Sequence, residues 1–336
     1  MTTNNLPIIP SRTFADWKQM LHGFWPSKAT FTEKDYPEFK DKVIIVTGGN
    51  TGVGYETVKS LAGSTKAKIY IFSRNKEKTL KAIEQIELEV AKEYKIKPIP
   101  IGFIQTDLGD LTSIKPAVNE FLSKESRLDL IILNAGVMMP PPGSKTKQGY
   151  ELQLGTNVLG HFLLQRLLDP IFIKTSFNNP PGVSRIVWVA STAHQLAPLG
   201  GIFWEDKNFD KVPYNSNTKM QLYGQSKAAD ILLAKAWPRF NPDAKNVIST
   251  SLCPGYLQTE LTRHSSAFEL FLGKLLTWPR RNGAYTELYA AFSPNIKNGD
   301  YSISFGEPSH VRKDLNSIEA GDKLWDWCVK ETNPYV

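Results

Sequence analysis

Seven short runs of apolar, mostly β-branched residues are spaced along the chain, with longer amphipathic stretches between them. These runs show no alternation of polar and apolar residues, so a strand formed by each must be covered on both faces. The pattern predicts an α/β, doubly wound fold: a parallel sheet of about seven strands with helices on both faces. Strands are expected at Val43–Val46, Lys68–Phe72, Ile99–Ile104, Leu130–Leu133, Ile186–Val189, Val247–Leu252 and Tyr301–Phe305.

The stretches between these runs carry helix signals. One is rich in Lys, Glu and Leu, as a solvent-facing helix should be, and another follows Asp110, a suitable N-cap. The last is expected to stop before Pro238, because proline lacks the N–H that a helix interior needs. The predicted helices are Asn75–Tyr94, Leu111–Lys124, Glu151–Leu168 and Lys219–Trp237.

A glycine-rich turn directly follows the first predicted strand and opens a helical pattern. Glycine is needed there because the backbone must approach a pyrophosphate closely and the next helix must pack tightly on the strand. The N-terminus of that helix then offers free N–H groups to phosphate. The turn predicts a dinucleotide-binding Rossmann fold whose cofactor contacts are Gly48, Asn50, Thr51, Gly52, Val53 and Gly54.

The chain divides into three predicted parts around that fold. Residues 41–305 are expected to form the Rossmann-fold catalytic domain, with a substrate lid at 263–281. Residues 1–40 are interpreted as an N-terminal extension, and residues 306–336 as a C-terminal helical extension of the same domain.

The end of the second predicted strand selects the cofactor in this type of fold. An acidic residue there would bind a ribose hydroxyl of NAD, but the chain has Ser73-Arg74-Asn75 instead. The guanidinium of Arg74 could bind a 2′-phosphate by charge-assisted hydrogen bonds. The sequence therefore predicts NADP(H) as the cofactor; a solvated arginine at a strand end is the alternative.

Tyr223 and Lys227 are four residues apart and thus share one face of a predicted helix. A free tyrosine has a pKa of about 10, too high for easy proton exchange near neutrality. A nearby ammonium and the positive charge of an oxidised nicotinamide both favour the phenolate. We therefore expect the pKa of Tyr223 to be lowered, so that it serves as general acid for carbonyl reduction or general base for alcohol oxidation.

Further polar residues follow other predicted strands. Ser191 comes just after the fifth strand and could bind a substrate oxygen, and Asn157 lies within a predicted helix, where asparagine is mildly unfavourable. Ligands of open α/β sheets bind at the carboxyl ends of the strands. Residues 134–136 and 254–259 are expected at the same edge. His161 and His194 lie beside these residues and are interpreted as structural.

Together the segments TGGNTGVG, LNAG, GTNVLGHF, ASTAH, YGQSK and PGYLQT resemble the short-chain dehydrogenase/reductase family over about residues 41–305. The similarity is greatest to its retinol-dehydrogenase-like and WW-domain-oxidoreductase-like branch, which includes many fungal members. The chain has Ala190 where that branch commonly has Ser, and Cys253 where it commonly has His. It contains no WW domain.

The resemblance implies a role for each matching residue. Asn157, Ser191, Tyr223 and Lys227 would form the catalytic tetrad, with Lys227 also holding the nicotinamide ribose. The implied cofactor contacts, beyond the glycine turn and Arg74, are Asp107, Leu108, Asn134, Ala135, Gly136, Tyr223, Lys227, Pro254, Gly255, Leu257 and Thr259.

Composition excludes several classes of ligand and location. The two cysteines, Cys253 and Cys328, form no disulfide framework and lack the spacing of metal ligands. We therefore expect no metal, and we expect a reducing, cytoplasmic location. The net charge of +7 comes from scattered lysines and arginines without a dense run, which argues against a nucleic-acid partner. No secretory signal or apolar run of about 20 residues is visible.

The apolar stretch at 268–278 has two interpretations. It is a buried helix or substrate lid, or it contacts a membrane or lipid-droplet surface as a peripheral segment. The first is favoured, and its apolar content suggests a lipophilic substrate.

The sequence thus predicts an NADP(H)-dependent oxidoreductase that acts on a carbonyl or alcohol of a lipophilic small molecule. A catalytically idle NADP(H)-binding regulatory protein is the main alternative, disfavoured because all four tetrad residues are present. A nucleotide-sugar epimerase is disfavoured by the spacing of the glycines. Monomer and homodimer both remain open.

Overall fold

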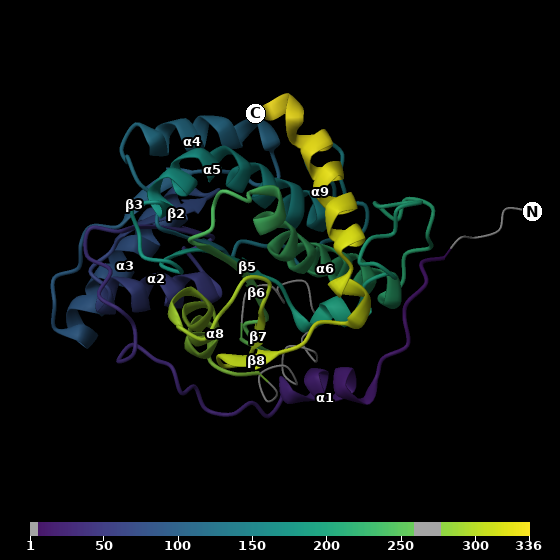
Figure 1. Cartoon of the computed structure of the whole chain (residues 1–336), viewed down its shortest axis with the longest axis horizontal. Helices are drawn as coiled ribbons and strands as arrows, with labels where there is room; N and C mark the ends of the chain where they lie inside the picture. The colour runs from purple at the N-terminus through teal and green to yellow at the C-terminus, as the bar shows by residue number, and fades with distance from the viewer. Residues whose placement is uncertain (1–5, 259–276) are drawn as a thin grey trace, which may run out of the picture.

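The computed structural model describes residues 6–258 and 277–336, which form a sheet covered by helices on both faces (Figure 1). The sheet has eight strands in the order β3-β2-β1-β4-β5-β6-β7-β8. All neighbours pair in parallel except β7 and β8. The strands are β1 Val43–Thr47, β2 Lys68–Ser73, β3 Gly102–Gln105, β4 Leu130–Leu133, β5 Ser184–Val189, β6 Val247–Leu252, β7 Tyr301–Ile303 and β8 Glu307–Ser309.

The predicted doubly wound α/β fold is confirmed, with two differences at its edges. The third strand begins at Gly102 rather than Ile99. The chain turns back after β7 at Gly306, so Phe305 lies outside the strand and β8 pairs antiparallel with β7. The sheet therefore extends beyond residue 305, where the C-terminal extension was predicted to start.

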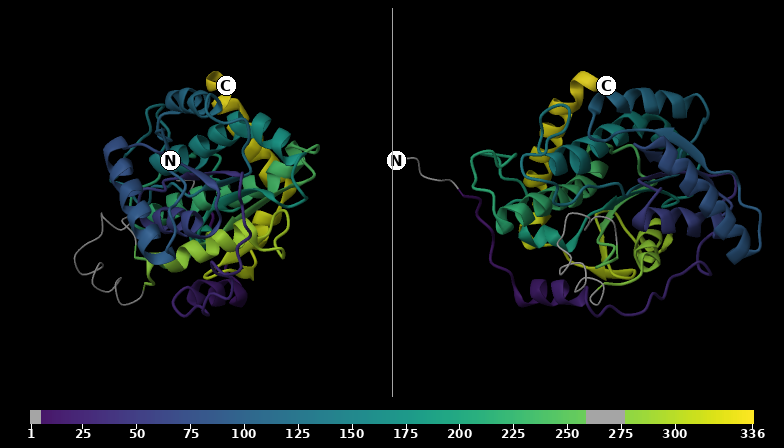
Figure 2. Two further views of the ribbon diagram at one scale, coloured as in Figure 1. Left: turned by 90° about the vertical axis from the view of Figure 1, so that its left-hand side faces the viewer. Right: turned by 180° about the vertical axis from the view of Figure 1, so that it is seen from behind.

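The strands are apolar throughout because each contributes to two cores. In β1, Val43 and Ile45 face one hydrophobic cluster, while Ile44 and Val46 face the other. Alternating side chains point to opposite faces of a sheet, and here both faces are dry. Helices α2 Gly52–Ser64, α3 Lys76–Tyr94 and α8 Arg280–Phe292 pack together on one side, and α4 Ile114–Leu122, α5 His161–Ser176, α6 Ser216–Phe240 and α9 Ile318–Thr332 lie on the other (Figures 1 and 2).

The expected end of the longest helix was wrong. Helix α6 passes through Pro238 and ends at Phe240. The fully buried Trp237 donates from Nε1 to Asp169 at 3.0 Å, and the guanidinium of Arg239 donates to the Lys235 carbonyl at 2.8 Å. Tertiary packing and this side-chain donor stabilise a last turn that the proline weakens. Helix α5 likewise continues through Pro170.

The predicted helix at 111–124 has a 3₁₀ start, η1 Leu111–Ser113, before α4, with Asp110 as its N-cap. Shorter elements complete the described chain: α1 Phe14–His22, η3 Thr192–Leu196, η5 Lys313–Asn316 and η6 Asn333–Tyr335. Among residues 6–258 and 277–336, no helix is both long and apolar enough to cross a bilayer.

Helix α8 carries a buried carboxyl group against α2. Glu287 is fully buried, and its Oε2 accepts a 2.7 Å hydrogen bond from the Thr57 hydroxyl. Its Oε1 has no hydrogen-bond partner within the described residues. Burial raises the pKa of Glu287 from 4.5 to about 8, and the Thr57 hydrogen bond opposes the shift only in part. The native chain therefore holds this side chain protonated near neutrality.

Glu287→Gln should make stability less dependent on pH. Because the folded-state pKa is raised, the native state retains a proton that the unfolded state loses, so stability falls as pH rises from about 4.5 to about 8. The stability of the glutamine variant should not decrease over this range, so that at pH 8 the variant is more stable than the wild type by about a few kcal/mol. Denaturant unfolding across this range checks it, with Glu84→Gln on the exposed surface as control; equal pH slopes in the variant and the wild type would contradict it.

Candidate active site

The predicted phosphate-binding turn lies between β1 and α2. Gly48 has φ of +66°, in the left-handed region, and a Cβ on Gly54 would lie 2.4 Å from Nδ2 of Asn134. Thr51 is the N-cap of α2 but makes no side-chain cap, so the first N–H groups of the helix remain available to another acceptor. A narrow, glycine-rich turn at a helix N-terminus fits a phosphate group.

The loop after β4 is fastened to the end of β1. The Asn134 amide donates to the Thr47 carbonyl at 2.8 Å, and the Ala135 N–H donates to the Thr47 hydroxyl at 2.9 Å. A Cβ on Gly136 would lie 3.4 Å from Oδ1 of Asn157. These contacts bring residues 134–136 beside the glycine turn, where the sequence placed them.

The end of β2 presents Arg74 to solvent. Within the described residues its guanidinium forms no hydrogen bond or ion pair, while its carbonyl accepts a 3.2 Å hydrogen bond from Gln105. The neighbouring Asn75 has a structural role: it caps α3, where its side chain accepts from the Lys78 N–H at 2.9 Å. Two further predicted cofactor contacts follow β3. Asp107 is half-buried and its Oδ1 accepts from the Gly109 N–H, and Leu108 belongs to the hydrophobic core.

Asn157 lies in a π-helical segment, η2 Leu154–Gly160, that leads into α5. Its Oδ1 accepts from the Val137 N–H at 2.8 Å, and its Nδ2 donates to the Val137 carbonyl at 3.0 Å and to the Ser226 hydroxyl at 3.0 Å. The side chain therefore joins the loop after β4 to α6. This explains an asparagine at a fully buried helical position, and π-helical turns are frequent at functional sites.

Tyr223 and Lys227 lie on one face of α6, with Lys227 Nζ 6.0 Å from the centre of the tyrosine ring. Ser191 ends the β5 segment and caps η3, accepting from the Ala193 N–H at 3.1 Å. Its side chain also interacts with the Tyr223 hydroxyl. The structure thus brings Ser191, which is distant in the sequence, next to the tyrosine and lysine of α6.

The electrostatics of Tyr223 differ from the sequence-based expectation. Burial raises its pKa, whereas the Lys227 charge and the Ser191 hydroxyl lower it without reversing the shift. The expected effect of Lys227 has the right sign, but the net direction was wrong because burial disfavours the phenolate and the sequence argument considered only charge.

Lys227 is held by a carboxylate that the sequence analysis missed. Its Nζ donates to the Val189 carbonyl at 2.8 Å and to Oδ2 of Asp230 at 2.9 Å. Burial lowers the pKa of Lys227, but Asp230 and Tyr223 outweigh it and the net shift is upward. The spacing of three residues between the lysine and the carboxylate on a helix is visible in the sequence. The burial of the carboxylate is not visible there.

The two neighbouring histidines have structural partners. His161 bonds through Nδ1 to the Asn157 carbonyl at 3.0 Å and through Nε2 to the Thr47 hydroxyl at 2.9 Å. His194 bonds through Nδ1 to the Ser191 carbonyl at 2.8 Å. Burial lowers the pKa of His161 to about 3 and that of His194 to about 4, so both rings are neutral and fix backbone near the site.

The end of β6 lies beside the glycine turn. Gly255 has φ of +110°, and its Cβ would meet the Ser304 hydroxyl oxygen at 2.5 Å. Leu257 packs with Val53 and Phe305 in a small apolar cluster. Thr259 and residues 263–276 of the predicted lid lie outside the described residues; Arg280 and Arg281 begin α8. Within the described chain no group of His, Cys, Asp and Glu has the arrangement of a metal site.

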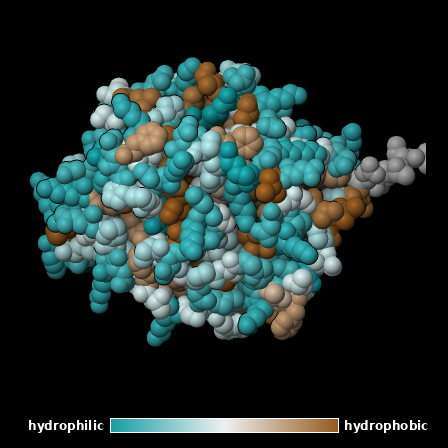
Figure 3. Space-filling view, in the orientation of Figure 1, coloured by the Kyte–Doolittle hydropathy of each residue, from teal (hydrophilic) through white to brown (hydrophobic). Residues whose placement is uncertain are grey.

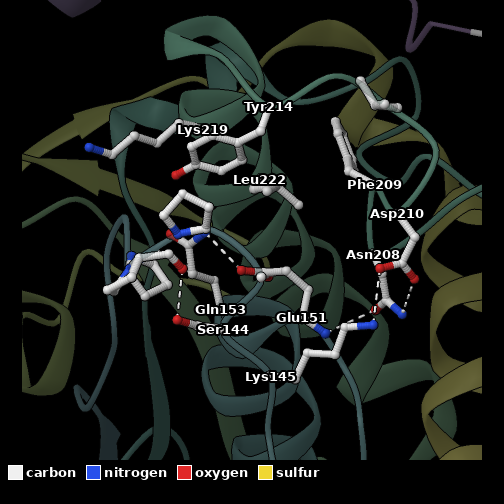
Figure 4. Close-up of a pocket in the computed structure, with 15 residues that line it drawn as sticks. Ser144, Lys145, Glu151, Gln153, Asn208, Phe209, Asp210, Tyr214, Lys219 and Leu222 are labelled. Carbon is white, nitrogen blue, oxygen red and sulfur yellow. Dashed lines mark hydrogen bonds and ion pairs between the residues drawn. The ribbon is translucent and has the colours of Figure 1, made fainter.

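A cavity of about 230 Å³ is lined by residues of the segments 140–153 and 208–222 (Figure 4). Lys219 lines it one helical turn before Tyr223, and Gln153 lines it shortly before Asn157. Its wall combines apolar groups such as Phe209 and Leu222 with polar ones, including Glu151, whose carboxylate accepts from Gln153 at 3.0 Å. None of the four predicted tetrad residues lines this cavity, although Leu222, which does, directly precedes Tyr223 in α6.

Comparison with known proteins decides the family. A short-chain dehydrogenase/reductase of Armillaria gallica is 36% identical over 319 residues, which cover 94% of this chain and 98% of the relative. The chain is a member of the short-chain dehydrogenase/reductase family. The family profile described as short chain dehydrogenase matches residues 42–202. An uncharacterised oxidoreductase of Schizosaccharomyces pombe is 41% identical over 287 residues, covering 82% of this chain and 81% of the relative.

Solved structures of this family share the fold. An uncharacterised protein of Mycobacterium paratuberculosis superposes with a TM-score of 0.66 at 25% identity, covering 90% of this chain and 97% of that one. A carbonyl reductase from chicken fatty liver, solved with NADPH bound, has a TM-score of 0.58 at 20% identity, covering 81% of this chain and all of its own. The family and the fold resemblance predicted from the motifs are thereby confirmed, and the protein is an oxidoreductase of this family.

Asp230→Asn should move the upper pH limit of carbonyl reduction to lower pH. The Asp230 charge raises the pKa of both Lys227 and Tyr223, so its removal lowers both. The measurement is kcat/KM against pH for any carbonyl that the enzyme reduces.

Asp169→Asn provides the control for that experiment. Asp169 is a half-buried carboxyl group whose pKa is raised to about 7 by burial, but it bonds to Gln165 and Trp237. Its replacement should leave the pH limit where it is. An unmoved limit in a folded Asp230→Asn variant, or an equal shift in both variants, would contradict a role for Asp230 in positioning the lysine charge.

Proposed function

We propose that the protein is an NADP(H)-dependent oxidoreductase that interconverts a carbonyl and an alcohol on a lipophilic small molecule. The observation that carries the proposal is the meeting of Ser191, Tyr223 and a buried, charged Lys227 at the carboxyl ends of the strands. The family supports oxidoreductase chemistry, and the glycine turn supports a dinucleotide.

The residues fit NADP(H) at both ends. The narrow turn formed by Gly48 and Gly54 and the uncapped start of α2 suit the pyrophosphate, and Arg74 is exposed at the end of β2 with its guanidinium unpaired within the described residues. A guanidinium there would bind a 2′-phosphate by charge-assisted hydrogen bonds. Lys227 and residues 134–136 would hold the nicotinamide end. When bound, NADP(H) supplies or accepts the hydride.

In the proposed mechanism, Tyr223 transfers the proton. Its hydroxyl donates to the carbonyl oxygen in reduction and takes the proton back in oxidation. The Ser191 hydroxyl binds the same oxygen and orients it. Burial holds Tyr223 protonated, as an acid must be before transfer, and the Lys227 ammonium stabilises the phenolate that remains.

Asn157 is proposed to keep this arrangement in place. Because it bonds to Val137 on one side and Ser226 on the other, it fixes the loop after β4 relative to the helix that carries Tyr223. The distance between substrate and proton donor must hold to fractions of an ångström for efficient transfer. We therefore include Asn157 in the catalytic group.

The cavity supports an apolar substrate with a polar edge. Phe209, Val212 and Leu222 offer apolar contacts, and Glu151 and Gln153 offer acceptor and donor groups. Such a combination is typical of sites for small organic molecules. The division into domains, the cytoplasmic location, the oligomeric state and the cofactor role of Thr259 stay predictions of the sequence.

Arg74→Asp should shift cofactor preference from NADPH toward NADH. In the wild type a 2′-phosphate gains a charge-assisted contact worth about 1.5–3 kcal/mol, or roughly tenfold to a hundredfold in affinity. In the variant the phosphate meets a like charge, while a ribose hydroxyl gains an acceptor. The measurement is kcat/KM for each cofactor over a panel of ketones, aldehydes and secondary alcohols.

Lys97→Asp, in the exposed segment between α3 and β3, reproduces the charge change away from the end of β2 and should leave the cofactor ratio unchanged. A wild type that prefers NADH, or an unchanged ratio after Arg74→Asp, would rule out the assigned role of Arg74. Cofactor binding without turnover of any compound in the panel would instead favour the idle regulatory protein.

A further inference from the structure

Helix α1 is amphipathic in the reverse of the usual sense. Asp16 and Gln19 are buried, at 4% and 4% exposure, whereas Phe14, Trp17 and Leu21 are exposed at 85%, 49% and 54%. Residues 14, 17 and 21 follow the spacing of one helix face, which here points away from the protein. In Figures 1 and 2 the helix lies at the margin of the molecule, beyond β8.

Polar contacts fix the helix in that orientation. Oδ1 of Asp16 and Oε1 of Gln19 accept from the Gln195 amide at 3.1 and 3.0 Å, and Nε2 of Gln19 donates to the Ser309 hydroxyl at 2.9 Å and to the His310 carbonyl. Thr13 and Asp16 form a capping box at the N-terminus. The outward direction of the apolar face is therefore built into the contacts of the inner face.

The apolar surface continues on both sides of α1. Trp25 is 73% exposed after the helix, and Leu6 and Ile8 are 58% and 71% exposed before it. Brown and tan atoms in Figure 3 lie over this part of the molecule. Exposed aromatic and aliphatic side chains gathered in one segment mark an interaction surface, whereas single ones are ordinary.

Within residues 6–30 the exposed lysine and arginine charges have one sign, while Glu307 of β8 lies 3.2 Å from Nε2 of His22 on α1. Between residues 6 and 30, Lys18 and Lys28 are exposed and Arg12 is partly exposed, while the segment's single carboxylate, Asp16, faces inward. The whole chain carries a net charge of +7. A surface with Trp, Phe and Leu flanked by lysines suits the interface of an anionic lipid layer, where aromatic rings lie at headgroup depth and lysines meet lipid phosphates.

We propose that α1 and its flanking residues, from Leu6 to Lys28, form a docking surface for an anionic membrane. The helix lies in the plane of the interface and inserts Phe14, Trp17, Leu21 and Trp25 among the acyl chains. Lys18 and Lys28 bind the headgroups.

Docking would also orient the site. Helix α1 contacts η3, the turn that follows Ser191, and the Met20 carbonyl accepts a 3.0 Å hydrogen bond from Tyr256, two residues after Pro254. The carboxyl ends of β5 and β6 would then lie close to the lipid, a source of lipophilic substrate. This last consequence rests on the proposed function, whereas docking itself does not.

Flotation of the full chain with vesicles tests the surface without any turnover. Vesicles of phosphatidylcholine mixed with phosphatidylserine should bind the wild type, and phosphatidylcholine alone should bind it more weakly. The triple variant Phe14→Ser, Trp17→Ser, Leu21→Ser should bind mixed vesicles at least about tenfold more weakly, since each inserted side chain loses apolar burial. Leu88→Ser with Phe177→Ser, at sites 61% and 60% exposed, is the matched control and should bind as the wild type does.

A second pair of variants tests the charges. Lys18→Glu with Lys28→Glu should weaken binding to mixed vesicles by about tenfold or more, while Lys78→Glu with Lys97→Glu, the same charge change on exposed sites elsewhere, should have a much smaller effect. Thermal melting establishes that each variant is folded. Absence of vesicle binding by the wild type, or undiminished binding by the folded α1 variants, would overturn the proposal. So would a concentration-dependent dimer that replaces vesicle binding and is lost in the triple variant, because the face would then join two copies.

Discussion

The ammonium of Lys227 is buried, and the surrounding structure must compensate for the water that it has lost. An unpaired charge in such a place is strongly unfavourable, so a lysine there needs hydrogen-bond acceptors and an opposite charge. The Val189 carbonyl at the end of β5 and the Asp230 carboxylate on α6 supply them. The hydrogen bond to Val189 also binds α6 to the end of β5, and this holds Tyr223 beside Ser191. The contacts of Lys227 thus determine both where Tyr223 lies and which charge it faces.

A second network fixes the opposite side of the site. Thr47 binds the loop after β4 through its carbonyl and its hydroxyl, and Asn157 binds the next residues of that loop and reaches Ser226 on α6. His161 joins the two parts by contacting Thr47 and the Asn157 carbonyl. The ends of β1, β4 and β5 are therefore connected by side chains before any ligand binds. Such preorganisation lowers the cost of aligning reacting groups.

Much of this architecture could be predicted from sequence, because it depends on local patterns. Doubly buried strands are visible as apolar runs, and the glycine turn and the tyrosine–lysine spacing carry chemical constraints of their own. Features that depend on burial by distant segments could not be found in the same way. The raised pKa of Tyr223, the burial of Asp230 and the passage of α6 through Pro238 all result from packing. Helix α1 shows the same limit, since the burial of its polar face depends on hydrogen bonds that the distant Gln195 donates and Ser309 accepts.

In the proposed reaction, Tyr223 gives a proton, and a nicotinamide gives a hydride, to the same carbonyl group. The most direct measurement follows deuterium from NADPH labelled at C4 of the nicotinamide into products from a carbonyl panel, by mass spectrometry, for the wild type and Tyr223→Phe. We expect deuterium on the carbinol carbon of the product with the wild type. With Tyr223→Phe, turnover should fall by at least about a hundredfold, the effect of losing a general acid, while NADPH binding is retained. Transfer at the wild-type rate in the phenylalanine variant, or bound NADPH that passes no deuterium to any carbonyl, would contradict it.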